Sequence, residues 1–295
     1  MIRDRAVLIT GASGGIGRAA AVEFARTCKG SAHLFLVGRD AGRLKDSAAA
    51  VQDAGGCGTT PGDGAPAVTL LTGDVTQPAA VAQIAATVER TTGRLDVLVH
   101  CAGQLEVGPA EELGPTVAER LMRVNFLGAV NTIHACLPLL RRGRRPVIIN
   151  VSSIAGRLAP PHMGAYAASK FALNAYSHSL RQELRKDGIR VCLVLPGPVD
   201  TAMVKGKIGG PFYSVPRGTP VLSPRHVAGV IIALADRPRR EAVIPSWLTP
   251  GGWLGSAFPS VVDGLYWATA SFRGLRKRFR QQPAGDSRRE TPGLM

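Results

Sequence analysis

A tyrosine and a lysine four positions apart, Tyr166 and Lys170, are the residues of this sequence whose types and spacing most directly suggest chemistry. Residues four apart on a helix share a face, so the phenol and the ammonium would be neighbours. A nearby positive charge lowers the pKa of a tyrosine from its ordinary value of about 10. Tyr166 would then be able to act as a general acid or base. Because the same spacing also occurs by chance, the surrounding sequence must show whether this pair is catalytic.

A glycine-rich turn near the start of the chain supplies that context. Residues 10–17 read Thr-Gly-Ala-Ser-Gly-Gly-Ile-Gly and stand between a strand-like run and a helical pattern. Glycine permits the tight turn and lets backbone N–H groups approach a pyrophosphate. The following helix N-terminus adds partial positive charge for the phosphates. A glycine cluster alone is often only a turn, but in this position it predicts a dinucleotide site.

The end of the second predicted strand bears on which dinucleotide is bound. The chain there reads Gly38-Arg39-Asp40, about twenty residues beyond the glycine turn. An acid at this place holds the ribose 2′-hydroxyl of NAD, whereas an arginine accommodates the 2′-phosphate of NADP. A guanidinium pairs with a phosphate bidentately, so Arg39 favours NADP(H). Asp40 keeps NAD(H) open, and Arg39 could also be a solvated loop residue.

Short apolar runs alternate with helical patterns through most of the chain. This alternation predicts a parallel sheet covered on both faces, an α/β doubly wound Rossmann fold with three αβα layers. No composition break divides residues 1–245, which we expect to form a single domain. The predicted strands are residues 6–10, 34–37, 68–71, 95–99, 147–151 and 189–195. The predicted helices are residues 16–28, 43–53, 78–91, 111–140 with a break at 114–115, and 165–186, and residues 54–64 are a predicted surface loop.

The last fifth of the chain has a different composition. Residues 246–275 hold the aromatic side chains Trp247, Trp253, Phe258, Tyr266, Trp267 and Phe272 among glycines and prolines. We expect an extension that packs on the domain or on another subunit. A wall of the substrate pocket and a contact with a membrane surface are alternatives. The basic residues 276–295 are predicted to be a disordered tail.

Charge and cysteine usage exclude several classes of function. The net charge is +15, but the arginine clusters form no recognisable nucleic-acid-binding module, so we expect no nucleic-acid partner. Five widely spaced cysteines without a CxxC pair argue against a disulfide framework and a zinc site, and we expect no metal. A reducing, cytoplasmic location fits this pattern. No apolar run approaches the roughly 18 residues of a membrane-spanning helix.

Together these motifs resemble the short-chain dehydrogenase/reductase family over about residues 4–245. The turn at residues 10–17 is similar to the family's TGxxxGxG motif, and Tyr166 with Lys170 to its YxxxK motif. Ser153 has the spacing of the catalytic serine, with Ser152 as the neighbouring alternative, and Asn125 matches the asparagine of the tetrad. The predicted cofactor contacts are Gly11, Ser13, Gly14, Gly15, Ile16, Gly17, Arg39, Asp74, Val75, Ala102, Gly103, Tyr166, Lys170, Pro196, Gly197, Val199 and Thr201.

The resemblance implies an oxidoreductase of class EC 1.1.1 that interconverts a carbonyl and a secondary alcohol by hydride transfer to or from a nicotinamide. Tyr166 would be the proton donor, Ser153 would orient the substrate oxygen, Lys170 would bind the ribose, and Asn125 would position a water. Alternatives are an NAD-dependent alcohol dehydrogenase and a non-catalytic dinucleotide-binding sensor or scaffold. The family also implies a homodimer or homotetramer.

The expected substrate is a small apolar molecule of steroid-like, retinoid-like or long-chain type. Residues 202–222 fall where the family carries its variable substrate lid, and they include Phe212 and Tyr213. Met163 is a further predicted contact. Mobile loops of this kind often close over ligands.

One pair of residues departs from the family pattern. His100-Cys101 replaces the usual Asn-Asn before Ala102-Gly103. A thiol is a weak donor and acceptor, so Cys101 cannot replace the hydrogen bonds of an amide. We expect a tolerated structural change and a packed rather than catalytic His100.

Overall fold

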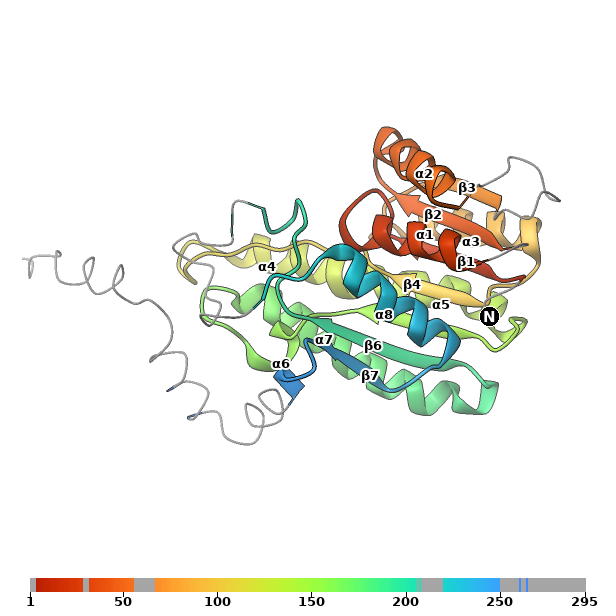
Figure 1. Cartoon of the computed structure of the whole chain (residues 1–295). Coiled ribbons are helices and arrows are strands. Elements are labelled where there is room, and N and C mark those ends of the chain that lie inside the picture. The colour runs from red at the N-terminus through yellow and green to blue at the C-terminus, as the bar shows by residue number, and fades with distance from the viewer. Residues whose placement is uncertain are drawn as a thin grey trace, which may run out of the picture.

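The computed structural model describes residues 4–28, 32–55, 67–205, 207, 220–249, 260 and 264. In this part of the chain, seven strands form one sheet in the order β3-β2-β1-β4-β5-β6-β7, and all neighbouring strands are parallel (Figure 1). The strands are β1 (Ala6–Thr10), β2 (His33–Gly38), β3 (Ala67–Thr72), β4 (Val97–His100), β5 (Val147–Val151), β6 (Arg190–Pro196) and β7 (Glu241–Ile244). The predicted doubly wound parallel sheet is confirmed.

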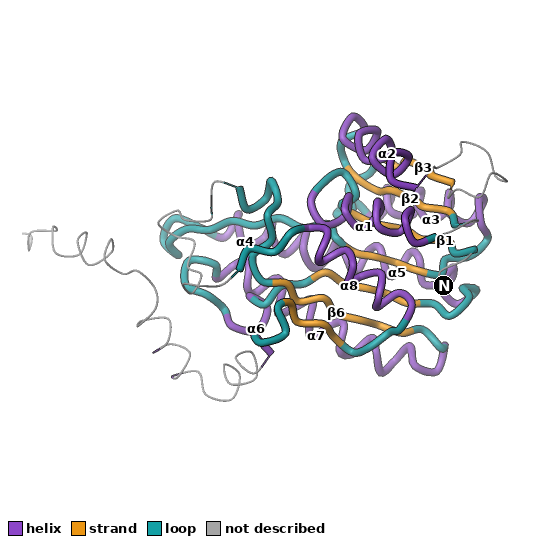
Figure 2. Tube along the Cα trace, viewed as in Figure 1, coloured by secondary structure: helices purple, strands orange, loops and turns teal. Residues whose placement is uncertain are grey.

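Helices cover both faces of this sheet, and Figure 2 shows the strands between them. Neighbouring residues of a strand face opposite sides, so apolar runs such as β5 bury every residue. One face packs against α1 (Gly15–Thr27), α2 (Ala41–Gly55) and α8 (Pro224–Asp236). The other packs against α3 (Pro78–Thr92), α5 (Gly128–Arg141) and α7 (Gly164–Glu183). The predicted three-layer αβα arrangement is therefore confirmed.

Several elements differ from the sequence prediction. The predicted helix 111–140 is α4 (Pro115–Met122), a π-helical turn η1 (Arg123–Leu127) and α5, and the expected break is where α4 begins. The end of the predicted helix 165–186 is a 3₁₀ turn, η2 (Leu184–Asp187). Helix α2 continues through Gly55, so residues 54 and 55 of the predicted loop 54–64 are helical, and the rest of that loop lies outside the described residues. The short helix α6 (Ala155–Leu158), α8 and β7 were not predicted.

The order of the strands determines where a ligand can bind. From β1 the chain builds the sheet outward through β2 and β3, and it then returns to place β4 on the other side of β1. A crevice forms beyond the carboxyl ends of two neighbouring strands where the winding direction reverses. Here those ends are Thr10 of β1 and His100 of β4, which are paired in register. The glycine turn follows the first, and Cys101 follows the second.

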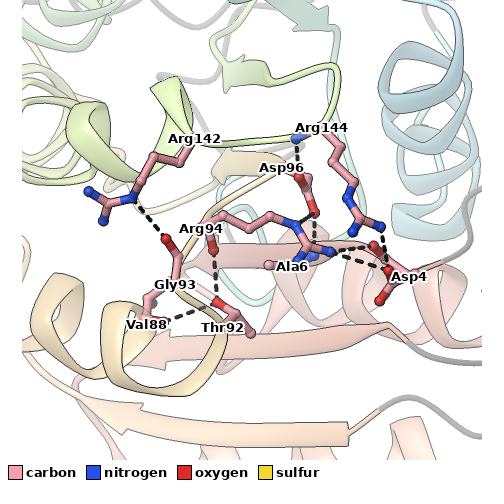
Figure 3. A network of polar contacts seen from close by, with 9 residues as sticks. All are labelled: Asp4, Ala6, Val88, Thr92, Gly93, Arg94, Asp96, Arg142 and Arg144. Carbon is pink, nitrogen blue, oxygen red and sulfur yellow. Dashed lines mark hydrogen bonds and ion pairs between the residues drawn. The ribbon is translucent and has the colours of Figure 1, made fainter.

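A network of polar contacts holds the amino ends of the strands together, at the opposite edge of the sheet (Figure 3). The buried carboxylate of Asp96 accepts hydrogen bonds from the backbone N–H groups of Ala6 and Arg144. It also forms an ion pair with Arg94. Arg94 and Arg144 both pair with Asp4. One carboxylate thus fixes the start of β1 against the segments that lead into β4 and β5.

The predicted tail 276–295 and most of the predicted extension 246–275 lie outside the described residues. Trp247 is described and is exposed, whereas Trp253, Phe258, Tyr266, Trp267 and Phe272 are not described. None of the helices in the described ranges is long and apolar enough to span a bilayer.

Candidate active site

A cavity of about 680 Å³ lies beyond the carboxyl ends of the strands. Its walls include the turn after β1, the segments after β2, β3, β4 and β5, the start of α7, and the segment after β6. Of the sequence-predicted site residues, those that line it are Gly11, Ser13, Gly14, Gly15, Ile16, Arg39, Asp74, Val75, Ala102, Gly103, Ser153, Tyr166, Lys170, Pro196, Gly197, Val199 and Thr201. Gly17 and Asn125 do not line it, and their surroundings explain why.

The glycine turn forms one end of the cavity. Gly11 has a φ of +66°, in the left-handed region, and a Cβ there would lie 2.8 Å from the backbone nitrogen of Ala102. Gly17 lies in the first turn of α1 and packs against the Gly11 carbonyl, where a side chain would collide with the backbone. Gly17 therefore allows α1 to start close to the turn and serves the site without touching its contents.

Lys170 and Tyr166 lie side by side on α7, as their spacing predicts. The Lys170 ammonium nitrogen lies 5.9 Å from the centroid of the Tyr166 ring. It donates a hydrogen bond to the Val151 carbonyl oxygen at 3.0 Å. Burial lowers the pKa of Lys170 to about 8. The lysine side chain is therefore fixed by the end of β5 and is charged at neutral pH.

The two serines after β5 take different positions. Ser153 lines the cavity, and its hydroxyl oxygen accepts a hydrogen bond from the Ala155 backbone N–H at 3.1 Å. This contact holds the hydroxyl at the start of the short helix α6. Ser152 also lines the cavity, but it is buried, and its hydroxyl lies 3.5 Å from the Lys170 carbonyl oxygen. Ser153 is therefore the accessible serine of the two, and Ser152 is the buried one.

Asn125 sits in the π-helical turn between α4 and α5 and is fully buried. Its side-chain oxygen accepts from the backbone N–H of Gln104 at 2.7 Å, and its amide nitrogen donates to the Gln104 carbonyl at 2.9 Å. The amide nitrogen also donates to the Ser169 hydroxyl. A Cβ on Gly103 would lie 3.2 Å from the Asn125 oxygen and 3.7 Å from the Lys170 nitrogen. Asn125 therefore holds the segment after β4 in place beside Lys170.

The unusual pair His100-Cys101 is tied to β1 through Thr10. The Thr10 hydroxyl lies 3.0 Å from Nδ1 of His100 and accepts from the Ala102 backbone N–H at 3.2 Å. Burial, together with the charge of Lys170, lowers the His100 pKa to about 3. Burial raises the pKa of the Cys101 thiol to about 12, against the effect of Lys170. Both side chains are neutral at physiological pH, and His100 is packed, as expected from the sequence.

The end of the cavity formed by the glycine turn also holds two arginines. Arg39 lines it where the sequence predicts a phosphate contact. Arg43, on the first turn of α2, also lines it and was not predicted. A Cβ on Gly14 would lie 2.6 Å from an Arg43 guanidinium nitrogen, so this side chain extends over the glycine turn. Asp40 is not among the lining residues, because its carboxylate accepts from the Arg43 backbone N–H at 3.0 Å and caps α2.

The opposite end of the cavity is mainly apolar with a charged border. Met163 lines it as predicted, together with Leu105, Leu158, Met203, Val204 and Leu248. The charged border consists of Glu106, Arg120 and Lys207; the sequence analysis named none of them as a site residue, although Lys207 falls in the predicted lid 202–222. No motif marks them, since they come from three separate segments. Of the predicted lid 202–222, residues 206 and 208–219 lie outside the described part of the chain, including Phe212 and Tyr213.

Comparison with known proteins agrees with this arrangement. A family model described as short chain dehydrogenase matches residues 5–208. The chain is 30% identical over 281 residues to dehydrogenase/reductase SDR family member 7B of Bos taurus, covering 94% of this chain and 83% of that protein.

Two solved structures show the same fold with different cofactors. One is an alcohol dehydrogenase from the archaeon Thermococcus sibiricus complexed with 5-hydroxy-NADP, with 27% identity, a TM-score of 0.68, and coverage of 81% of this chain and 95% of that one. The other is a short chain dehydrogenase from Mycobacterium paratuberculosis bound to NAD, with 25% identity, a TM-score of 0.70, and coverage of 82% and 96%. The choice between the cofactors therefore has to come from this chain's own residues.

Proposed function

The chain belongs to the short-chain dehydrogenase family, and from this membership we propose an NADP(H)-dependent oxidoreductase that interconverts a carbonyl and a secondary alcohol on an apolar substrate. The observation that carries the proposal is that Ser153, Tyr166 and Lys170 line the same cavity as the glycine turn. Proton transfer and hydride transfer need their groups within reach of one carbonyl, and a shared cavity provides for this.

The residues present fit a dinucleotide. The glycine turn and the N-terminus of α1 both line the cavity, so backbone N–H groups and the positive end of the helix dipole are available to a pyrophosphate. The nicotinamide, when bound, supplies or accepts the hydride at the carbonyl carbon. Lys170 is the residue that would hold the nicotinamide ribose. Its amine is already anchored by the Val151 carbonyl and needs little reorganisation.

Tyr166 donates the proton in the reducing direction, to the oxygen of the carbonyl as the carbon receives the hydride. The adjacent Lys170 ammonium favours the phenolate that remains. Ser153 donates a hydrogen bond to the same oxygen and orients it, which stabilises the developing negative charge. Asn125 holds Gln104 and with it the wall beside Lys170, and we assign to it a positioning role. In the oxidising direction the same groups act in reverse.

Preference for NADP(H) is supported by positive charge at the end of the cavity that the glycine turn forms. Arg39 and Arg43 both line that end, and two guanidinium groups suit a 2′-phosphate. An enzyme selective for NAD(H) needs a carboxylate for the ribose hydroxyls. Asp40 caps α2 and is not a lining residue, so it is poorly placed for that task.

The apolar substrate is supported by the other end of the cavity. Leu105 and Met163 are buried in one cluster with Tyr166, so apolar side chains directly surround the proposed proton donor. An apolar lining of this kind suits a small molecule with an apolar body.

Cofactor oxidation tests the proposal. Purified protein is mixed with NADPH or NADH and a panel of aliphatic, aromatic and steroid ketones, and absorbance of the reduced cofactor is followed. We expect turnover with at least one ketone and a higher kcat/KM for NADPH. Tight NADPH binding without turnover of any ketone, or of the matching alcohols with NADP⁺, would instead indicate a non-catalytic dinucleotide-binding protein.

A further inference from the structure

Three charged side chains meet at the apolar end of the cavity. The Glu106 carboxylate lies between two cations, with one oxygen 3.2 Å from Arg120 and the other 3.4 Å from Lys207. Arg120 also donates to the Gln104 side-chain oxygen at 3.2 Å. Lys207 also donates to the Leu105 carbonyl oxygen. We call Glu106, Arg120 and Lys207 the charged triad.

The charged triad is hydrogen-bonded to the part of the cavity wall that lies beside Tyr166. Lys207 binds the backbone of Leu105, and the Leu105 side chain lies in the buried cluster that contains Tyr166. Asn125 fixes Gln104 on the other side of Leu105. The triad is therefore fixed in position beside Leu105, whose side chain forms part of the apolar wall next to Tyr166.

The charges of the triad do not balance. Two cations share one carboxylate, which leaves a net charge of +1 on a border whose neighbouring wall is apolar. The three side chains are 46%, 35% and 32% exposed for Arg120, Glu106 and Lys207, so a ligand can reach them. A purely apolar substrate gains nothing from two cations. An anion gains charge-assisted hydrogen bonds from both.

We propose that the substrate is an apolar carbonyl compound that carries a carboxylate at a distance from the reacting carbon, and that Arg120 and Lys207 bind this carboxylate. Glu106 is the internal counter-ion, which holds the two cations at the cavity and competes with the substrate for them. The inference rests on the proposed carbonyl reduction and specifies the substrate class of that site. Arg120 and Lys207 are then specificity-determining residues.

Matched substrates test the proposal on the full-length protein with NADPH. A series of ketones with a terminal carboxylate, differing in chain length, is compared with the methyl esters of the same compounds. We expect a kcat/KM at least about tenfold higher for the acid than for the ester at the best chain length, as one charge-assisted contact supports. Calorimetry of acid and ester against the protein with NADPH gives the same comparison without turnover.

Substitutions with opposite expected effects show whether the triad recognises the substrate carboxylate or only stabilises the structure. Arg120→Gln and Lys207→Gln should each lower the acid-to-ester ratio by about tenfold. Glu106→Gln should raise it, because it removes the competing carboxylate. Arg123→Gln is the matched control: Arg123 is exposed, pairs with Glu119, and does not line the cavity. It should leave the ratio unchanged.

Two results would overturn the proposal. One is equal kcat/KM and equal affinity for acid and ester throughout the series. The other is a loss of kcat/KM in Glu106→Gln that is the same for acid and ester, which would show that the triad has only a structural role. If acid binds more tightly than ester but neither is reduced, the anion site stands and the proposed reaction fails. If the ester is reduced with the same kcat/KM as the acid, the proposed reaction stands and the anion site fails.

Discussion

The Lys170 ammonium lies 5.9 Å from the centroid of the Tyr166 ring and is bonded at 3.0 Å to the carbonyl oxygen of Val151. Val151 is the last residue of β5, and Ser153 follows two residues later. The end of one buried strand thus determines the position of the lysine on α7 and of the serine that faces the cavity. This relationship explains how residues from a strand end and a helix meet beside one tyrosine.

Burying Lys170 has a cost in stability that a substitution should recover. Its pKa is lowered from 10.5 to about 8, chiefly by burial, so the folded protein carries the ammonium unfavourably at neutral pH. Lys170→Met should abolish turnover and raise the free energy of unfolding by about 2 kcal/mol at pH 7, after loss of the bond to Val151. Urea denaturation of both proteins measures the difference.

The pH dependence of that difference has a definite sign. Between pH 8 and 10.5 the unfolded chain holds a proton on Lys170 and the folded protein does not, so this group makes the wild type more stable as pH rises. The advantage of Lys170→Met should therefore be full below pH 8 and shrink toward pH 10.5. A variant that is less stable at pH 7, or a difference that is constant with pH, would contradict the account.

Arg43 should contribute to cofactor choice. Its guanidinium extends over Gly14 at the end of the cavity where Arg39 also lies. Arg43→Gln should lower the ratio of kcat/KM for NADPH to that for NADH by about tenfold, because one phosphate contact is lost. Lys45→Gln, on the same helix but not lining the cavity, is the control and should keep the ratio. Equal losses with both cofactors would show that Arg43 does not recognise the 2′-phosphate.

Asp96 should be important for stability but not for cofactor binding. It accepts backbone hydrogen bonds from Ala6 and Arg144 at the amino ends of the strands, away from the cavity (Figure 3). Asp96→Ala leaves both backbone donors without this acceptor, the Ala6 N–H in a buried place, and should lower the free energy of unfolding by about 2 to 4 kcal/mol. The exposed pair of Glu119 with Arg123 supplies the control: Glu119→Ala should cost less than about 0.5 kcal/mol. Similar losses in urea denaturation would refute the prediction.

The sequence predicted those features that depend on short stretches of chain. The buried strands, the glycine turn and the pairing of Tyr166 with Lys170 each follow from residues close together, so periodicity and spacing were sufficient. The π-helical turn at Asn125 was not predictable in this way, because its residues continue the helical pattern on either side and its amide bonds Gln104 in another segment of the chain.

The other omissions have a similar origin. Arg43 reads as an ordinary helical residue until the fold places α2 beside the glycine turn. The charged triad joins three segments, and only the folded chain brings Glu106 between Arg120 and Lys207. The exchange of Asn-Asn for His100-Cys101 reads as a loss of hydrogen bonds, whereas Thr10 bonds both His100 and the Ala102 backbone.

The measurement that tests the central proposal most directly compares Tyr166→Phe with Tyr176→Phe, a tyrosine on the same helix that contacts Phe126 instead of the cavity. For each protein, NADPH affinity and kcat/KM with the best ketone are determined. We predict that Tyr166→Phe loses at least about a hundredfold in kcat/KM with nearly unchanged NADPH affinity, and that Tyr176→Phe loses little. A Tyr166→Phe protein that keeps most of its activity would contradict the assignment of Tyr166 as the proton donor.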